Sequence, residues 1–204
     1  MVNVFDQIKN NPMTVLGAKY TAGDIRNVWK QISIQIIHSL KDGKGVVIKG
    51  LGTFTLSNWS LETGNNNRTL DVWRPVFLIS RALMEDFDLH QPKQYANDAI
   101  PLAPISYHQI ADVCRLSKEA VTGCIQETTQ CLRKVISDRN NVNFPLHPLG
   151  SLAVFDTKVV FTFHEPWQPR CQETPTYCAK FPPAITAYEK KSQVPCPGHA
   201  GPKF

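Results

Sequence analysis

The chain has 204 residues, 42% of them hydrophobic, and a formal net charge of +5. This length can bury one good core or two small ones, and we expect two small domains. No stretch approaches the roughly 20 apolar residues that span a bilayer. Asp6 and Lys9 interrupt the segment where a signal peptide needs an apolar core. These features favour a soluble, intracellular protein.

Positive charge is concentrated near the C-terminal end of the chain. Residues 1–98 contain 11 Lys and Arg against 9 Asp and Glu, residues 99–165 contain 6 of each, and residues 166–204 contain 5 against 2. The folded part therefore lacks the excess of cations that would neutralise a row of phosphates. Residues 166–204 also hold eight of the 15 prolines and show no apolar periodicity, which predicts a disordered tail.

A long amphipathic helix is expected near the start of the first domain. Residues 4–9 predict a short helix that the Asn10-Asn11-Pro12 run ends, and Thr21 then caps the long helix with Asp24 as an imperfect capping box. Gly43 and Gly45 end it. Its apolar residues recur at intervals of three and four and so share one face that points into a core: Ile25, Val28, Trp29, Ile32, Ile36 and Leu40.

The segment after this helix contains a motif that occurs twice. Strands are predicted over residues 46–48 and 53–56, and the glycines of Gly50-Leu51-Gly52-Thr53-Phe54 form the turn between them. A degraded copy, Leu149-Gly150-Ser151-Leu152, places Gly150 98 positions after Gly52. A helix, a strand, a glycine turn and a second strand, present in both places, indicate a supersecondary unit used twice. The repeat favours a binding or scaffolding module, since neither copy contains catalytic residues.

The first copy has a hairpin arm that the second lacks. Residues 64–67 are polar and predict the arm tip, residues 74–79 predict the closing strand, and Ser80 is expected to cap a short helix ending near Phe87. From Gly52 to Val76 the first copy uses 24 positions, whereas the second uses 11 from Gly150 to Phe161. In the second copy a tight turn at Asp156-Thr157-Lys158 takes the place of the arm.

The second domain is expected to follow the same plan. Ser106 and Gln109 form a capping box, Ile110 and Val113 are predicted on one helix face, and Ser117 caps a helix over residues 118–137. Strands are predicted over residues 142–146, 153–155 and 159–163. The inward face of the long helix is predicted to consist of Val121, Cys124, Ile125, Thr128, Leu132, Val135 and Ile136.

This order of elements resembles the HU/IHF fold of bacterial architectural DNA-binding proteins. Leu116-Ser117-Lys118-Glu119-Ala120 resembles the link between the first two HU helices, and Gly50-Leu51-Gly52-Thr53-Phe54 resembles the strand turn. Two units in tandem, with residues 61–66 and Arg74-Pro75-Val76-Phe77 in the first, are similar to the amino-terminal region of the eukaryotic coiled-coil domain-containing protein 81 family over residues 20–165. The resemblance implies a centrosome-associated protein whose HU-like domains bind proteins and are followed in full-length members by a coiled coil. The sequence departs from that pattern by stopping at Phe204, as a short isoform, a divergent relative or a fragment would.

The arm, residues 57–73, distinguishes a DNA ligand from a protein ligand. HU arms are basic and insert a proline between base pairs, but this arm has only Arg68 against Glu62 and Asp71, and no proline. Two interpretations of its apolar residues remain open: cross-strand packing that holds the hairpin together, or an exposed ribbon that docks on a partner. The residues concerned are Trp59, Leu61, Leu70, Val72 and Trp73.

Other polar residues give weaker signals. Lys41, Lys44 and Lys49 flank the first hairpin, where they form either a solvated turn or phosphate contacts. Cys196 and His199 form half of a zinc site, but a second close pair is missing and no metal is expected. We expect Cys114, Cys124 and Cys131 to be reduced core thiols. Motifs of nucleotide-binding, hydrolase and metalloprotease sites are absent, so we expect no enzymatic activity and no cofactor.

The sequence therefore predicts an α+β protein with two HU/IHF-like domains. We place the first at residues 1–92, a linker at 93–104, the armless second domain at 105–165 and the tail at 166–204. The domains are expected to pair within the chain as a pseudo-dimer, or between chains in a homodimer. The predicted function is protein interaction at the centrosome, in the cytoplasm and away from membranes. The alternative is an architectural DNA-binding protein in the nucleus.

Overall fold

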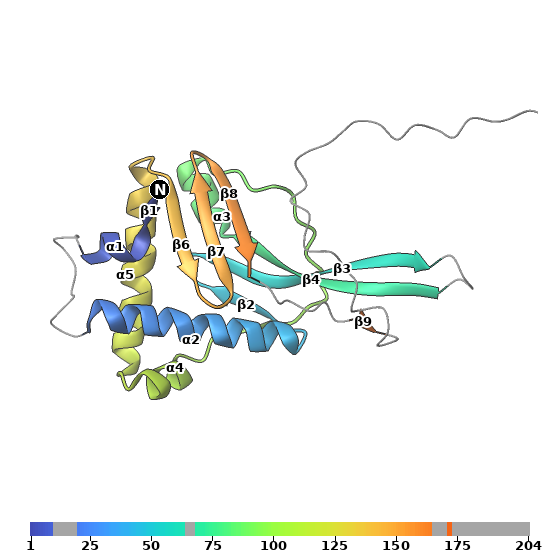
Figure 1. The fold of residues 1–204 in the computed structure, drawn as a ribbon, viewed down its shortest axis with the longest axis horizontal. Coiled ribbons are helices and arrows are strands. Elements are labelled where there is room, and N and C mark those ends of the chain that lie inside the picture. Colours follow the sequence, from blue (N-terminus) through green and yellow to red (C-terminus); the bar gives the residue numbers. More distant parts are fainter. Residues whose placement is uncertain (10–19, 64–67, 165–170, 173–204) are drawn as a thin grey trace, which may run out of the picture. The chain divides into compact units, whose positions relative to one another are not determined.

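The computed structural model describes residues 1–9, 20–63, 68–164 and 171–172 (Figure 1). Contacts divide the chain into residues 1–173, which form one compact unit, and residues 174–204, which lie outside the described residues. In chain order the elements are β1 (Val2–Asn3), α1 (Val4–Lys9), α2 (Ala22–Lys41), β2 (Gly45–Ile48), β3 (Gly52–Thr63), β4 (Arg68–Ile79), α3 (Arg81–Phe87), β5 (Leu102–Ala103), α4 (Tyr107–Cys114), α5 (Lys118–Ser137), β6 (Val142–Leu146), β7 (Gly150–Phe155), β8 (Lys158–Phe163) and β9 (Cys171–Gln172).

The two long helices begin at the caps that the sequence predicts. The Thr21 hydroxyl accepts a hydrogen bond from the Asp24 backbone N–H at 3.2 Å, and the Asp24 carboxylate accepts one from the Thr21 N–H at 2.7 Å, which makes a complete capping box. The Ser117 hydroxyl caps α5 through the Ala120 N–H at 3.1 Å. All the apolar residues predicted for the inner face of α2 are buried, as are those predicted for α5.

The inner face of α4 differs from the prediction. Ile110 is buried as expected, but Val113 is 63% exposed, and Ala111 is buried in its place. Tyr107 and Cys114 pack partly against the core. Positions 107, 110, 111 and 114 follow the i, i+3, i+4, i+7 spacing of one helix face, and position 113 falls outside it.

Each module completes the sheet of the other. One sheet has the order β1-β6-β7-β8 and the other β5-β2-β3-β4-β9. β1, at the start of the first module, pairs in parallel with β6 of the second, where Val2 aligns with Val142. β5, which precedes the second module, pairs in parallel with β2 of the first, where Ala103 aligns with Val46. The segment 93–104, predicted as a linker, therefore supplies a strand.

The connection after α3 joins the two sheets a third time. The His90 N–H donates to the Thr157 carbonyl at 2.6 Å, and the Val159 N–H donates to the His90 carbonyl at 2.9 Å, next to β8. The Gln91 side chain accepts from the Ile79 N–H at 3.0 Å and donates to the Phe77 carbonyl at 2.6 Å, on β4. Two consecutive residues, His90 and Gln91, thus bind β8 of the second module and β4 of the first.

The modules share one hydrophobic core. Phe54 and Phe77 of the first module lie 5.2 and 5.1 Å from Phe161 of the second, measured between ring centroids. Phe77 and Phe161 occupy equivalent positions in the two copies, because each lies two residues before the strand residue that pairs with the turn glycine, Gly52 or Gly150. Trp29 packs edge-on against Phe144 of the second module with the centroids 4.9 Å apart. The arrangement is an intrachain pseudo-dimer.

Hydrogen bonds near the long helices also connect the two modules. The buried Trp29 indole N–H donates to the Thr128 hydroxyl at 2.9 Å, and the Tyr20 hydroxyl donates to the Glu127 carboxylate at 2.6 Å. Burial and this hydrogen bond raise the pKa of Tyr20 above its ordinary value. No helix among the described residues combines the length and apolar character that crossing a bilayer requires.

Candidate functional site

The arm is formed by continuations of β3 and β4. These strands pair antiparallel along their whole length, from Gly52 opposite Ile79 to Thr63 opposite Arg68. β2 pairs only with Gly52–Phe54 of β3, so the two strands continue beyond it as a ribbon (Figure 1). Residues 64–67, the predicted tip, lie outside the described residues. β7 and β8 are six residues each and form no comparable arm.

The register separates the predicted arm residues into two groups. Trp59 pairs with Val72, Leu61 with Leu70 and Thr63 with Arg68, so these positions share one face of the ribbon. We call the positions of Trp59, Leu61, Leu70 and Val72 the apolar face. Trp73 pairs with Asn58 and occupies the opposite face.

The base of the arm belongs to the core. Val72 is buried, and Trp73 is half-buried and packs against the core cluster. Trp73 therefore contacts the core. The side chains of Trp59, Leu61, Arg68 and Leu70 lie outside the described residues, so for them the choice between packing and docking stays a prediction.

The turn glycines are required by close backbone approach. A Cβ on Gly52 would lie 2.3 Å from the Leu78 carbonyl oxygen, and a Cβ on Gly150 would lie 2.3 Å from that of Thr162. Gly50 has a φ of +83°, a left-handed conformation that favours glycine. Phe54, which follows the first turn, is fully buried. The repeated motif thus marks the point where each hairpin passes closest to its closing strand.

One strand of the arm region was missed from the sequence. Cys171–Gln172, within the predicted disordered tail, form β9 and pair antiparallel with Asp71 and Val72 of β4. The rest of the tail, residues 165–170 and 173–204, lies outside the described residues. Two residues carry no periodicity, so no sequence signal distinguishes this strand from its surroundings.

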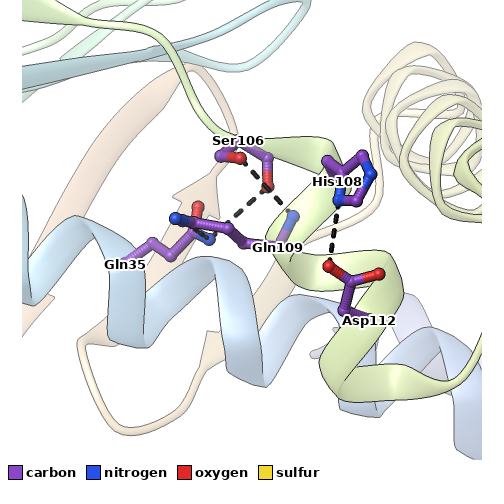
Figure 2. Close-up of polar contacts among 5 residues, drawn as sticks. All are labelled: Gln35, Ser106, His108, Gln109 and Asp112. Carbon is purple, nitrogen blue, oxygen red and sulfur yellow. Dashed lines mark hydrogen bonds and ion pairs between the residues drawn. The ribbon is translucent and has the colours of Figure 1, made fainter.

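Polar contacts also border the helix interface. Figure 2 shows Gln35 of α2 reaching toward Ser106 and Gln109 at the start of α4. The Gln35 amide lies 3.3 Å from the Gln109 side-chain oxygen, and the Ser106 hydroxyl accepts from the Gln109 N–H at 3.4 Å, which completes the N-cap. His108 and Asp112 form an exposed pair 2.9 Å apart, one turn along α4. The Gln35 contacts join the two modules, the other two are local to α4, and none of them assembles a reactive group.

The cysteines of α4 and α5 are core thiols. Cys124 and Cys131 are buried, Cys114 is half-buried, and all three are free. Burial raises the pKa of Cys124 to about 12 and also raises those of Cys114 and Cys131, so the thiols stay protonated at neutral pH. Within the described ranges, no group of three His, Cys, Asp or Glu residues is placed to hold a metal ion. Cys196 and His199 lie outside these ranges.

An open groove lies between α3, the end of α5 and the β7–β8 turn. It is lined by Glu85, Asp86, Asp88, Asp156 and Arg139, among others. Glu85 pairs with Arg81 at 2.7 Å, and Asp86 pairs with Arg133. Exposed, neutralised carboxylates of this kind resemble a solvated surface rather than a general acid and base pair.

Two helix-and-sheet modules in tandem, joined through their helices and extended by one hairpin arm, define a tandem HU-like protein. Comparison with family models agrees: residues 5–91 match CCDC81 eukaryotic HU domain 1, and residues 101–174 match CCDC81 eukaryotic HU domain 2. The chain therefore belongs to the CCDC81 family of eukaryotic HU-domain proteins. Both the tandem HU/IHF-like fold and the family predicted from the sequence are confirmed.

Proposed function

We propose that this protein is a non-enzymatic interaction module that binds other proteins through its arm and acts as a scaffold at the centrosome. The observation that carries this proposal is the register of the arm, which places Trp59, Leu61 and Leu70 on one face of a projecting ribbon, beyond the buried Val72 at its base. Apolar residues that gather on a projecting element favour docking of a protein surface. The centrosomal location and the cytoplasmic setting rest on the resemblance to the family.

Two features argue against DNA as the main ligand. Minor-groove architectural proteins combine cations with an apolar wedge, whereas the arm has one arginine, two acidic residues and no proline. Pro75 lies at the base, opposite Leu56, and not in the arm. The second module provides no second arm, because Asp156-Thr157 joins β7 directly to β8. A single arm with almost no net charge and no proline therefore provides few contacts to a DNA duplex.

The exposed lysines near the first hairpin do not change this conclusion. Lys41 occupies the last turn of α2, where a cation is favourable beside the carbonyl ends of a helix. Lys44 and Lys49 flank β2 and are exposed. Three phosphate contacts at most would give weak, strongly salt-dependent binding.

The test is recruitment of the tagged full chain to the centrosome in cells. Replacing Leu61 and Leu70, an opposed pair of the apolar face, by serine should abolish recruitment while the thermal midpoint stays within a few degrees of wild type. The matched control changes the neighbouring pair on the other face, Glu62→Gln with Thr69→Ser, and should be recruited normally.

Binding to duplex DNA measured by fluorescence anisotropy checks the alternative. We expect no binding tighter than that of a weakly basic protein. A dissociation constant below about 10⁻⁷ M at physiological salt, with a steep salt dependence and nuclear localisation, would contradict the proposal in favour of an architectural DNA-binding protein.

A further inference from the structure

One edge of the arm is covered by β9 at two residues, and the other edge is open among the described residues. β9 pairs with the outer edge of β4, and β2 covers β3 only at Gly52–Phe54. Among the described residues, no strand other than β4 pairs with β3 at positions 57–63. A two-stranded ribbon is marginally stable in water by itself, and an open edge is a template for a further strand. The open edge of β3 is therefore a candidate interaction surface.

The composition of this edge does not discourage pairing. Natural proteins protect edge strands with lysine, proline or a bulge. Positions 57–63 read Ser-Asn-Trp-Ser-Leu-Glu-Thr and contain none of these residues. The covered strand, β4, contains Pro75, Asp71 and two arginines. Pro75 and both arginines thus lie on β4, whereas positions 57–63 of β3 contain one charged residue, Glu62, and neither lysine nor proline.

The backbone shows which residues of β3 face outward. The Leu56 carbonyl accepts a hydrogen bond from the Asn97 N–H at 3.1 Å, on the side of β3 away from β4. The N–H and C=O of alternate residues point to the same side of a strand, so those of Asn58, Ser60 and Glu62 also face outward. Pro75 fits this pattern: it lies opposite Leu56, where β3 needs no N–H donor. The outward set is symmetric about Ser60.

We propose that a second copy of this chain docks on this edge, β3 against β3 and antiparallel, about a two-fold axis at Ser60. Ser60 then exchanges hydrogen bonds with its counterpart, and Asn58 does so with Glu62 of the second copy. Position 59 lies opposite position 61, so tryptophan meets leucine, and no like charges oppose each other. The apolar faces of the two arms become one continuous surface in a four-stranded sheet.

A second copy fits this edge because the other HU-like pairing surfaces are already used. The helices and sheets through which two modules associate are buried between the modules of one chain, with Phe77 and Phe161 in contact at the centre. Association between chains must therefore use another surface. Pairing through three outward residues buries less surface than the roughly 1,200 Å² that a stable complex buries. The dimer should therefore be weak and reversible.

Sedimentation equilibrium of the full chain, from micromolar to near-millimolar concentration, tests the proposal. We expect a monomer–dimer equilibrium that Ser60→Pro shifts to monomer by at least about tenfold in the association constant, because proline removes the outward N–H without removing a bond to β4. Ser60→Ala keeps the N–H and is the matched control, with dimerisation unchanged. Circular dichroism melts should show that both variants are folded.

A pair of substitutions at the exposed Asn58 tests the register. In the two-fold arrangement this position lies opposite Glu62 of the second copy. Asn58→Lys should strengthen dimerisation and Asn58→Glu should weaken it, each by about two- to tenfold, with smaller effects at high salt. A chain that stays monomeric throughout, a dimer insensitive to Ser60→Pro, or equal effects of the two charges would overturn the proposal. The recruitment and DNA-binding experiments can fail independently of this result.

Discussion

At the residue scale, one hydrogen bond explains a polar residue in the core. Thr128 is fully buried on α5, at a position where the sequence pattern calls for an apolar side chain. Its hydroxyl accepts from the Trp29 indole N–H of the other module and donates to the Cys124 carbonyl at 2.7 Å. A buried tryptophan needs a partner for its N–H, so Thr128 makes the pairing of the two modules specific.

Replacing Thr128 by valine should destabilise the protein. The shape is preserved while the Trp29 N–H loses its acceptor, so the free energy of unfolding should fall by about 1–3 kcal/mol. Urea unfolding measures the change. Thr122→Val on the same helix is the control, because the Thr122 hydroxyl donates to a carbonyl of its own helix, that of Lys118. If both substitutions lower the free energy of unfolding equally, the hydrogen bond between the modules does not contribute to stability.

The turn glycines should be intolerant in both copies. Gly52→Val and Gly150→Val each place a side chain against a backbone carbonyl, which cannot swing away as a flexible side chain can. Each should lower the free energy of unfolding by about 1–3 kcal/mol or more, and cellular abundance should fall with it. Gly23→Ala is the control, since its Cβ would meet only the Thr21 hydroxyl oxygen at 3.5 Å. A stable Gly150→Val variant would refute the structural equivalence of the turns.

At the element scale, the long helices and hairpins could be predicted and the short strands could not. Capping residues and apolar spacing identified α2 and α5, because their signals are local. β1, β5 and β9 are two residues each, and only their partners in the other module or on the arm make them strands. The Val113 prediction was wrong because an eight-residue helix offers two possible faces, and contact with α2 decided between them.

The arm itself was predicted, but the roles of its tryptophans were not. From the sequence, Trp59 and Trp73 are members of one apolar set, whereas the register puts them on opposite faces. Alternation in a strand fixes faces only when the pairing is known, and a shift by one residue would exchange them. The sequence could therefore identify the arm as a candidate site without resolving its two faces.

Trp73→Ser should lower stability, because Trp73 packs against the core. We expect the thermal midpoint to fall by several degrees, the size of shift that a loss of 1–2 kcal/mol produces in a domain of this size. Differential scanning calorimetry measures it. Thr69→Ser, farther out on the same face of β4, should leave the midpoint unchanged. A midpoint unaffected by Trp73→Ser would mean that the indole is free for a partner instead.

At the scale of the whole molecule, the chain is a pseudo-dimer in which one copy has specialised. The exchange of β1 and β5 means that neither module completes its sheet from its own elements. The second module provides helices, strands and aromatic contacts to the shared core, while the first carries the arm. The second copy contributes to the core without an arm, because its aromatic contacts with Phe54 come from Phe161 and Phe163, within the stretch where β7 and β8 pair.

Hydrogen exchange of a second-module core variant tests most directly whether the modules unfold as one. Leu152 is fully buried on β7, and Leu152→Ala should cost about 2–5 kcal/mol. If the core is shared, amides of α2 in the first module should lose protection by the same free energy as amides of α5. Loss of protection confined to α5 and its sheet, with α2 unchanged, would contradict the pseudo-dimer.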